Sequence, residues 1–92
     1  MSTKLIIESL SMDLLRAALG RYRGSIAMAE RFEKEALSRS RELESSRPKG
    51  HYLRSLISKT KKSLRSNSVK KAEELLLYSV LFKNLIQVNH PL

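Results

Sequence analysis

The sequence has no cysteine and no tryptophan, and it contains three glycines and two prolines in 92 residues. Without cysteine, neither a disulfide framework nor a thiolate zinc site can form, which fits a reducing compartment such as the cytoplasm. A chain of 10.5 kDa has room for one small domain, so we treat residues 1–92 as a single unit. The hydrophobic fraction of 41% is high enough for that unit to fold.

Long apolar runs are also missing. Near the N-terminus, Leu5, Ile6 and Ile7 are followed at once by Glu8, so no signal-peptide core is expected. The longest run, from Leu75 to Phe82, is far shorter than the ~20 residues that a membrane-spanning helix needs. We therefore expect a core helix there and no membrane span. Residues 51–65 are basic and amphipathic but lack a bulky aromatic wedge, which argues against binding to a membrane surface.

The apolar residues repeat with a period near 3.6, which predicts an all-α protein. In the N-terminal half, Leu15, Leu19, Tyr22, Ile26 and Ala29 fall along one line of a helical wheel, with Met12 beside them. This line predicts one helix over about 5–45. The sequence allows two starting points for this helix. Ser11 is a candidate N-cap with the anionic Asp13 in the first turn, and the alternative start is as early as Thr3.

The strongest break is the segment 46–50, where Pro48 and Gly50 predict a turn. A two-faced helix is predicted at 51–65. Its apolar stripe holds Leu53, Leu56, Ile57, Thr60 and Leu64, and the opposite half of the wheel holds Arg54, Lys59, Lys61, Lys62 and Arg65. Asn67 and Ser68 allow a further break at 66–68, although one long helix with a polar gap is an equal alternative.

An apolar helix is predicted at 69–88, ended by Asn89, His90 and Pro91. It carries two apolar stripes, one with Leu75 and Phe82 and the other with Val69, Leu76 and Val80. One hairpin seam cannot bury both. We therefore predict an antiparallel helical hairpin or a small three-helix bundle, completed by self-association into a homo-oligomer, with oligomer or partner contacts at Leu75, Leu76, Val80 and Phe82.

The charge is concentrated in one segment. The chain has 18 Lys and Arg against nine Asp and Glu, a net charge of +9. Half of the cations lie within residues 47–71, which contain no carboxylate, so the whole excess belongs to that segment. Its members are Arg47, Lys49, Arg54, Lys59, Lys61, Lys62, Arg65, Lys70 and Lys71.

The chain is poor in groups that do chemistry. His51 and His90 are its two histidines, and a hairpin would place them at opposite ends. Glu30 and Glu33 share a helix face without a histidine at a metal-binding spacing. We therefore expect no catalytic residue, no metal and no cofactor. Gly20 and Gly24 allow close approach of a second helix or are simply tolerated on the surface.

A cation-rich segment without carboxylates suits the fixed negative charge of a phosphate backbone. Five scattered aromatic residues, by contrast, do not supply a platform for stacking bases. We therefore expect a non-enzymatic module that holds nucleic acid electrostatically through residues 47–71, without strong sequence preference. The alternative is a protein-binding adaptor or inhibitor whose basic helix docks on an acidic protein surface.

Overall fold

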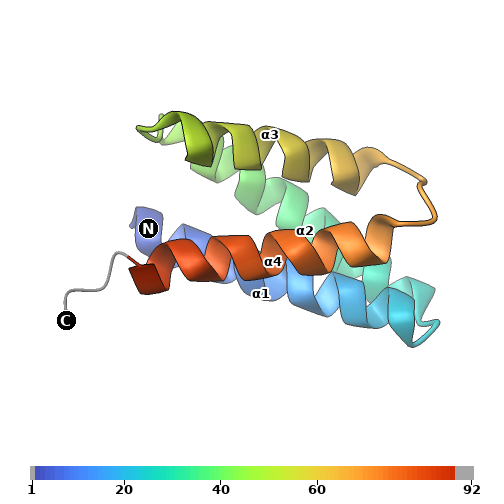
Figure 1. The fold of residues 1–92 in the computed structure, drawn as a ribbon. Coiled ribbons are helices and arrows are strands. Elements are labelled where there is room, and N and C mark those ends of the chain that lie inside the picture. Colours follow the sequence, from blue (N-terminus) through green and yellow to red (C-terminus); the bar gives the residue numbers. More distant parts are fainter. Residues whose placement is uncertain (1, 89–92) are drawn as a thin grey trace.

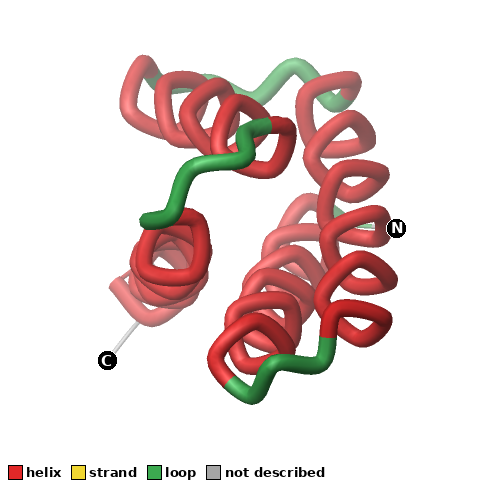
Figure 2. Tube along the Cα trace, turned by 90° about the vertical axis from the view of Figure 1, so that its right-hand side faces the viewer, coloured by secondary structure: helices red, strands yellow, loops and turns green. Residues whose placement is uncertain are grey.

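The described part of the chain forms an antiparallel bundle of four helices. The computed structural model describes residues 2–88, in which the order is α1 (Thr3–Tyr22), α2 (Ile26–Ser45), α3 (His51–Arg65) and α4 (Lys71–Val88), with no strand. The helices run alternately in opposite directions, and each packs against its neighbours in the sequence, with α4 returning to α1 (Figures 1 and 2). The predicted all-α class is therefore confirmed.

The predicted single helix over 5–45 is wrong. The chain turns back at residues 23–25, between α1 and α2. Gly24 adopts a left-handed conformation with φ +73°, the Ser25 N–H donates to the Gly20 carbonyl at 2.8 Å, and the Gly24 N–H donates to the Arg21 carbonyl at 3.1 Å. These two bonds form a Schellman motif, which satisfies the last carbonyls of α1 and ends the helix.

Gly20 lets α1 and α2 approach closely. A Cβ atom built on Gly20 would lie 2.7 Å from the backbone nitrogen of Ala29. The glycine is therefore buried in a backbone contact and is not a tolerated surface residue. The continuous seam drawn through Tyr22 and Ile26 is also wrong, because both side chains are about half exposed beside the turn.

The other boundaries follow the sequence closely. The N-terminal helix begins at Thr3, where the Ser2 hydroxyl accepts a hydrogen bond from the Leu5 N–H. The predicted turn at 46–50 is present, with Gly50 at φ +96°, and α3 spans the predicted range. Residues 66–70 separate α3 from α4, so the alternative with a break is the correct one. Val69, assigned to an apolar stripe, is fully exposed in this loop.

The core lies around α1, which packs extensively against both α2 and α4. Leu10, Leu14, Ala17 and Ala18 on α1 are completely buried. Leu75 and Phe82, predicted as oligomer contacts, are also completely buried, inside the single chain. Of the other two predicted contacts, Leu76 is half-buried against the core and Val80 is exposed. The predicted helix over 5–45 is in fact two helices, α1 and α2. One chain therefore covers by itself much of the apolar surface of α4 for which a second copy was predicted.

Candidate nucleic-acid interface

Helix α3 presents one apolar face to the bundle and one polar face to solvent. Leu56, Ile57, Thr60 and Leu64 are buried, and Leu53 is half-buried, as the apolar stripe predicts. The hydroxyl of Thr60 donates to the Leu56 carbonyl at 2.7 Å, so its burial leaves no polar atom unsatisfied. Because this face packs on the bundle, the opposite face of α3 is directed towards solvent.

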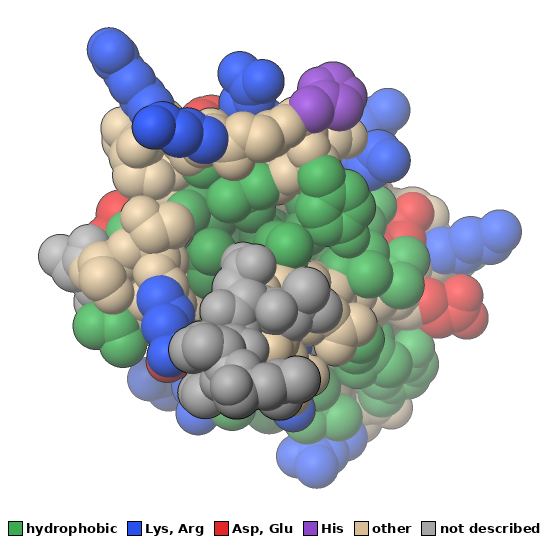
Figure 3. Space-filling model, turned by 60° about the vertical axis from the view of Figure 1, so that its left-hand side comes forward, with side chains coloured by type: hydrophobic (Ala, Val, Ile, Leu, Met, Phe, Trp, Pro, Cys, Tyr) green, Lys and Arg blue, Asp and Glu red, His purple; other side chains and the backbone are tan. Residues whose placement is uncertain are grey.

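The outward face and the two flanking loops carry a set of exposed cations. They form no ion pair with another described residue. We call this set the α3 cationic surface; it consists of Arg47, Lys49, Arg54, Lys59, Lys62, Arg65 and Lys70. Lys and Arg side chains project along the α3 edge of the molecule in Figure 3.

Lys71 does not belong to this surface, contrary to the sequence prediction. Its side chain is 7% exposed. The ammonium group donates to the Leu64 carbonyl at 2.8 Å and lies 3.1 Å from Glu33 Oε1. Lys71 therefore satisfies a carbonyl in the last turn of α3 and joins α3 and α4 to α2, and it is not available to a ligand.

Glu33 is the centre of a buried charge cluster that the sequence analysis missed. Arg21 donates to both oxygens of its carboxylate, and the bond to Oε1 is 2.8 Å long. Burial alone would raise the pKa of Glu33, but the hydrogen bonds from Arg21 and Lys71 outweigh it and lower the pKa below its ordinary value. The same contact raises the pKa of Arg21. The cluster links α1, α2 and α4, so its cations serve folding.

Lys61 is also engaged within the bundle. Its ammonium group donates to Glu44 Oε1 of α2 at 2.8 Å, and its side chain is more buried than that of its partner. The sequence places Lys61 on the solvent side of α3 with Lys62 and Arg65. The structure instead places it at the border with α2, where it is partly neutralised.

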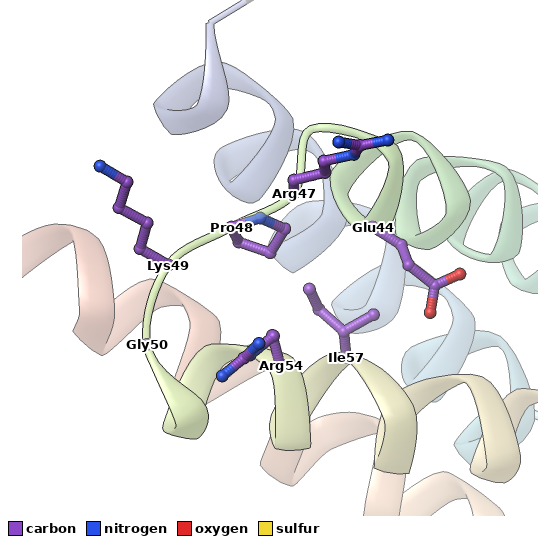
Figure 4. A pocket seen from close by; sticks show the side chains of 7 residues that line it. All are labelled: Glu44, Arg47, Pro48, Lys49, Gly50, Arg54 and Ile57. Carbon is purple, nitrogen blue, oxygen red and sulfur yellow. The ribbon is translucent and has the colours of Figure 1, made fainter.

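The turn between α2 and α3 forms a cleft of about 660 Å³ beside this border. Arg47, Lys49 and Arg54 line it together with Glu44, so the lining carries more positive than negative charge. Figure 4 shows Lys49 extending away from the turn, whereas Ile57 points towards Pro48. Arg47 has φ +52°, a left-handed conformation that non-glycine residues seldom adopt. The turn thus adds cationic side chains to one end of the α3 cationic surface.

Glu44 and Glu74, which line hollows beside this surface, already have partners within the bundle. The hydroxyl of Ser63 donates to Glu74 Oε1 at 2.9 Å, and Glu42 pairs with Arg39 on α2. On the α1–α2 side, the guanidinium groups of Arg16 and Arg31 lie 5.6 Å and 5.3 Å from the centre of the Phe32 ring. Arg16, Arg31 and Arg39 on that side therefore have a carboxylate or an aromatic ring as partner, whereas Arg23, Lys34 and Arg41 are exposed and form no ion pair with a described residue.

Of the groups considered for chemistry, the structure describes His51, Glu30 and Glu33. His51 is exposed at the start of α3, and His90 lies outside the described residues. Within residues 2–88 there is no cluster of three or more His, Asp or Glu side chains that could hold a metal ion. None of the described helices is long and apolar enough to cross a membrane.

Comparison of this chain with protein-family models, with curated proteins and with solved structures finds no match.

Proposed function

We propose that this protein is a non-enzymatic helical module that binds nucleic acid electrostatically through the α3 cationic surface. The observation that carries the proposal is the exposure of seven cations along α3 and its loops, with no carboxylate between residues 47 and 71. The helix is ~22 Å long at 1.5 Å per residue. A duplex segment of that length carries ~13 phosphates on its two strands, which exceeds the number of these cations.

The expected binding has little sequence preference. The surface offers lysines and arginines on a convex helix, and base reading needs side chains that enter a groove or stack on bases. Of the nine cations that the sequence suggested, the burial of Lys71 and the pairing of Lys61 leave seven. If five to seven of them neutralise phosphates, the logarithm of the affinity should fall with the logarithm of the salt concentration with a slope of ~4 to 6.

The experiment that tests this proposal is a salt titration of binding to labelled nucleic acid, followed by fluorescence anisotropy. Duplex DNA and single-stranded RNA of unrelated sequences are the probes. The proposal expects affinity that falls steeply with salt and differs little between sequences. If binding is absent at low salt, or does not depend on salt, the proposal is wrong.

A further inference from the structure

The seam between α3 and α4 is one of the two loosely packed seams of the bundle. Helix α3 packs less extensively against both of its neighbours than α1 packs against α2 and α4. Two adjoining hollows lie along the α3–α4 seam, with cavity volumes of about 220 Å³ and 460 Å³. Lys59 and Tyr78 line both hollows, so the two hollows adjoin along the seam, and we call them together the α3–α4 groove.

The smaller hollow is apolar and accessible. Tyr52 on α3 and Leu77 on α4 are 55% and 53% exposed, and both line it. Leu56 and Leu81 also contribute to its lining. Figure 3 shows hydrophobic side chains gathered between α3 and α4 at this side of the molecule, below the cations of α3. Exposed apolar side chains on two opposing walls are typical of a docking groove.

The larger hollow continues the groove towards the end of α3, and all of its lining residues carry a polar group. Lys59 and Lys62 line it, together with the hydroxyl-bearing loop residues Ser66 and Ser68. Glu74 is the carboxylate among its lining residues, and its Oε1 already accepts the hydrogen bond from Ser63. The groove thus joins an apolar strip to two accessible ammonium groups on the same wall.

We propose that this groove binds an acidic amphipathic helix of a partner protein. Apolar residues on one face of such a helix would pack on Tyr52, Leu77 and Leu81, and carboxylates beside that face would pair with Lys59 and Lys62. The apolar contacts supply affinity and the ion pairs set the orientation. This docking site goes beyond nucleic-acid binding, because the leucines contribute nothing to a phosphate contact.

The charges of the chain argue against a second copy of the protein as the occupant. Each copy carries a net charge of +9, and a symmetric contact would place the lysines of both grooves within one interface. Like charges brought together in this way oppose association. An acidic helix removes this repulsion and turns the same lysines into attractive contacts.

The test uses a labelled synthetic peptide of about 18 residues, long enough to form a helix, with leucines along one face and glutamates beside them. A scrambled peptide of identical composition and charge is the control. Binding to the full chain is followed by fluorescence anisotropy. The patterned peptide should bind measurably more tightly than the scrambled one, because only its apolar face matches the groove.

Two groove variants have matched controls in the same chain. Leu77→Gln and Tyr52→Ala should each lower the affinity for the patterned peptide about tenfold or more. Val80→Gln lies on α4 outside the groove lining, and Tyr22→Ala lies beside the α1–α2 turn; these side chains are 46% and 54% exposed. Both controls should change peptide affinity less than about twofold. Circular dichroism checks that each variant folds.

The groove proposal is overturned if the patterned peptide fails to bind, if the scrambled peptide binds equally, or if the control variants weaken binding as much. It is also overturned if Leu77→Gln reduces affinity for duplex DNA and not for the peptide, since the groove would then serve nucleic acid. Retained DNA binding with peptide binding lost in Leu77→Gln supports it. The two proposed functions can therefore fail separately.

Discussion

The α1–α2 region and the α3 region differ in how far their positive charge is balanced, because residues 2–46 hold eight cations and seven carboxylates, whereas residues 47–71 hold nine cations and no carboxylate. In α1 and α2, Arg21 and Arg39 pair with carboxylates, and the arginines at 16 and 31 lie over Phe32. Along α3 and its loops, seven cations face solvent without a described ion-pair partner. Charges that are paired and partly buried contribute to the fold, whereas exposed charges of one sign contribute little to stability and are available to a ligand.

The largest expected effect comes from removing the centre of the buried cluster. Glu33→Gln leaves Lys71 buried beside a neutral amide and should destabilise the protein by about 3 to 5 kcal/mol. Chemical denaturation at neutral pH measures this loss. The double variant with Lys71→Met should recover part of it, because no buried ammonium group then remains unpaired. Equal stability of the single variant and the parent protein would show that the cluster does not hold the bundle together.

The cluster also predicts a dependence on pH. The pKa of Glu33 is lowered below its ordinary value of 4.5, so its contribution to stability is fully present above pH 4.5. The contribution is lost as the pH falls below 4.5 and through the pKa of the folded state. The difference in unfolding free energy between the parent protein and Glu33→Gln should therefore shrink over this acidic range. If the difference in unfolding free energy stays constant over this acidic range, the lowered pKa of Glu33 is contradicted.

A somewhat smaller effect is expected at the α1–α2 contact. Gly20→Ala places a methyl group against the backbone of Ala29 and forces the two helices apart, at a cost of about 1 to 3 kcal/mol. Thermal unfolding followed by circular dichroism measures the cost. As a comparison, Ala27→Gly alters an exposed position near the start of α2 and tests the general effect of exchanging these two residues in a helix. If Gly20→Ala raised the midpoint by as much as Ala27→Gly lowers it, the methyl group would meet no obstacle and the close contact of the two helices would be contradicted.

The smallest stability effect concerns Asp13, which is buried on α1. Burial, and then the charge of Glu35, raise the pKa of Asp13 above its ordinary value of 3.8. Its ionised form is therefore disfavoured in the folded protein, and stability falls as the pH rises from 3.8 through the folded pKa. Asp13→Asn should raise the unfolding midpoint at pH 7 and make little difference below pH 3.8. A lower midpoint at pH 7 would contradict this environment.

The sequence is a good guide where one helix has one face to bury. The strong two-faced pattern of α3 predicts its bounds and its buried stripe, and Pro48 with Gly50 predicts the turn before it. The break at Gly24 is harder to predict, because apolar residues continue through the turn with nearly helical spacing. A glycine followed by Ser25, after arginines at 21 and 23, is nevertheless a typical helix-end signal.

The charge cluster could be only half predicted from sequence. Glu33 falls on the apolar seam of the N-terminal half, and Lys71 falls on the apolar stripe of the C-terminal half. Each is a charged residue at a position where an apolar one is expected. Two opposite charges on faces that become buried suggest a pair. Which residues meet depends on how α2 and α4 are brought together, and that follows from the α1–α2 turn. The accessible part of the cationic surface could therefore not be separated from the structural part by sequence alone.

The central claim is that the α3 cationic surface, and not the net charge of the whole molecule, determines the binding of nucleic acid. Two charge-matched variants separate these possibilities: Lys62, Arg65 and Lys70 replaced by glutamine, and Arg23, Lys34 and Arg41 replaced by glutamine. All six side chains belong to exposed residues, so both triple variants should retain the fold.

The decisive measurement is the salt dependence of affinity for one duplex DNA in the parent protein and these two variants. We expect the α3 variant to lower the log–log slope by about 2 to 3 and the control variant to change it by less than about 1. Equal slopes for the two variants would contradict the claim, because binding would then follow total charge rather than the surface built on α3.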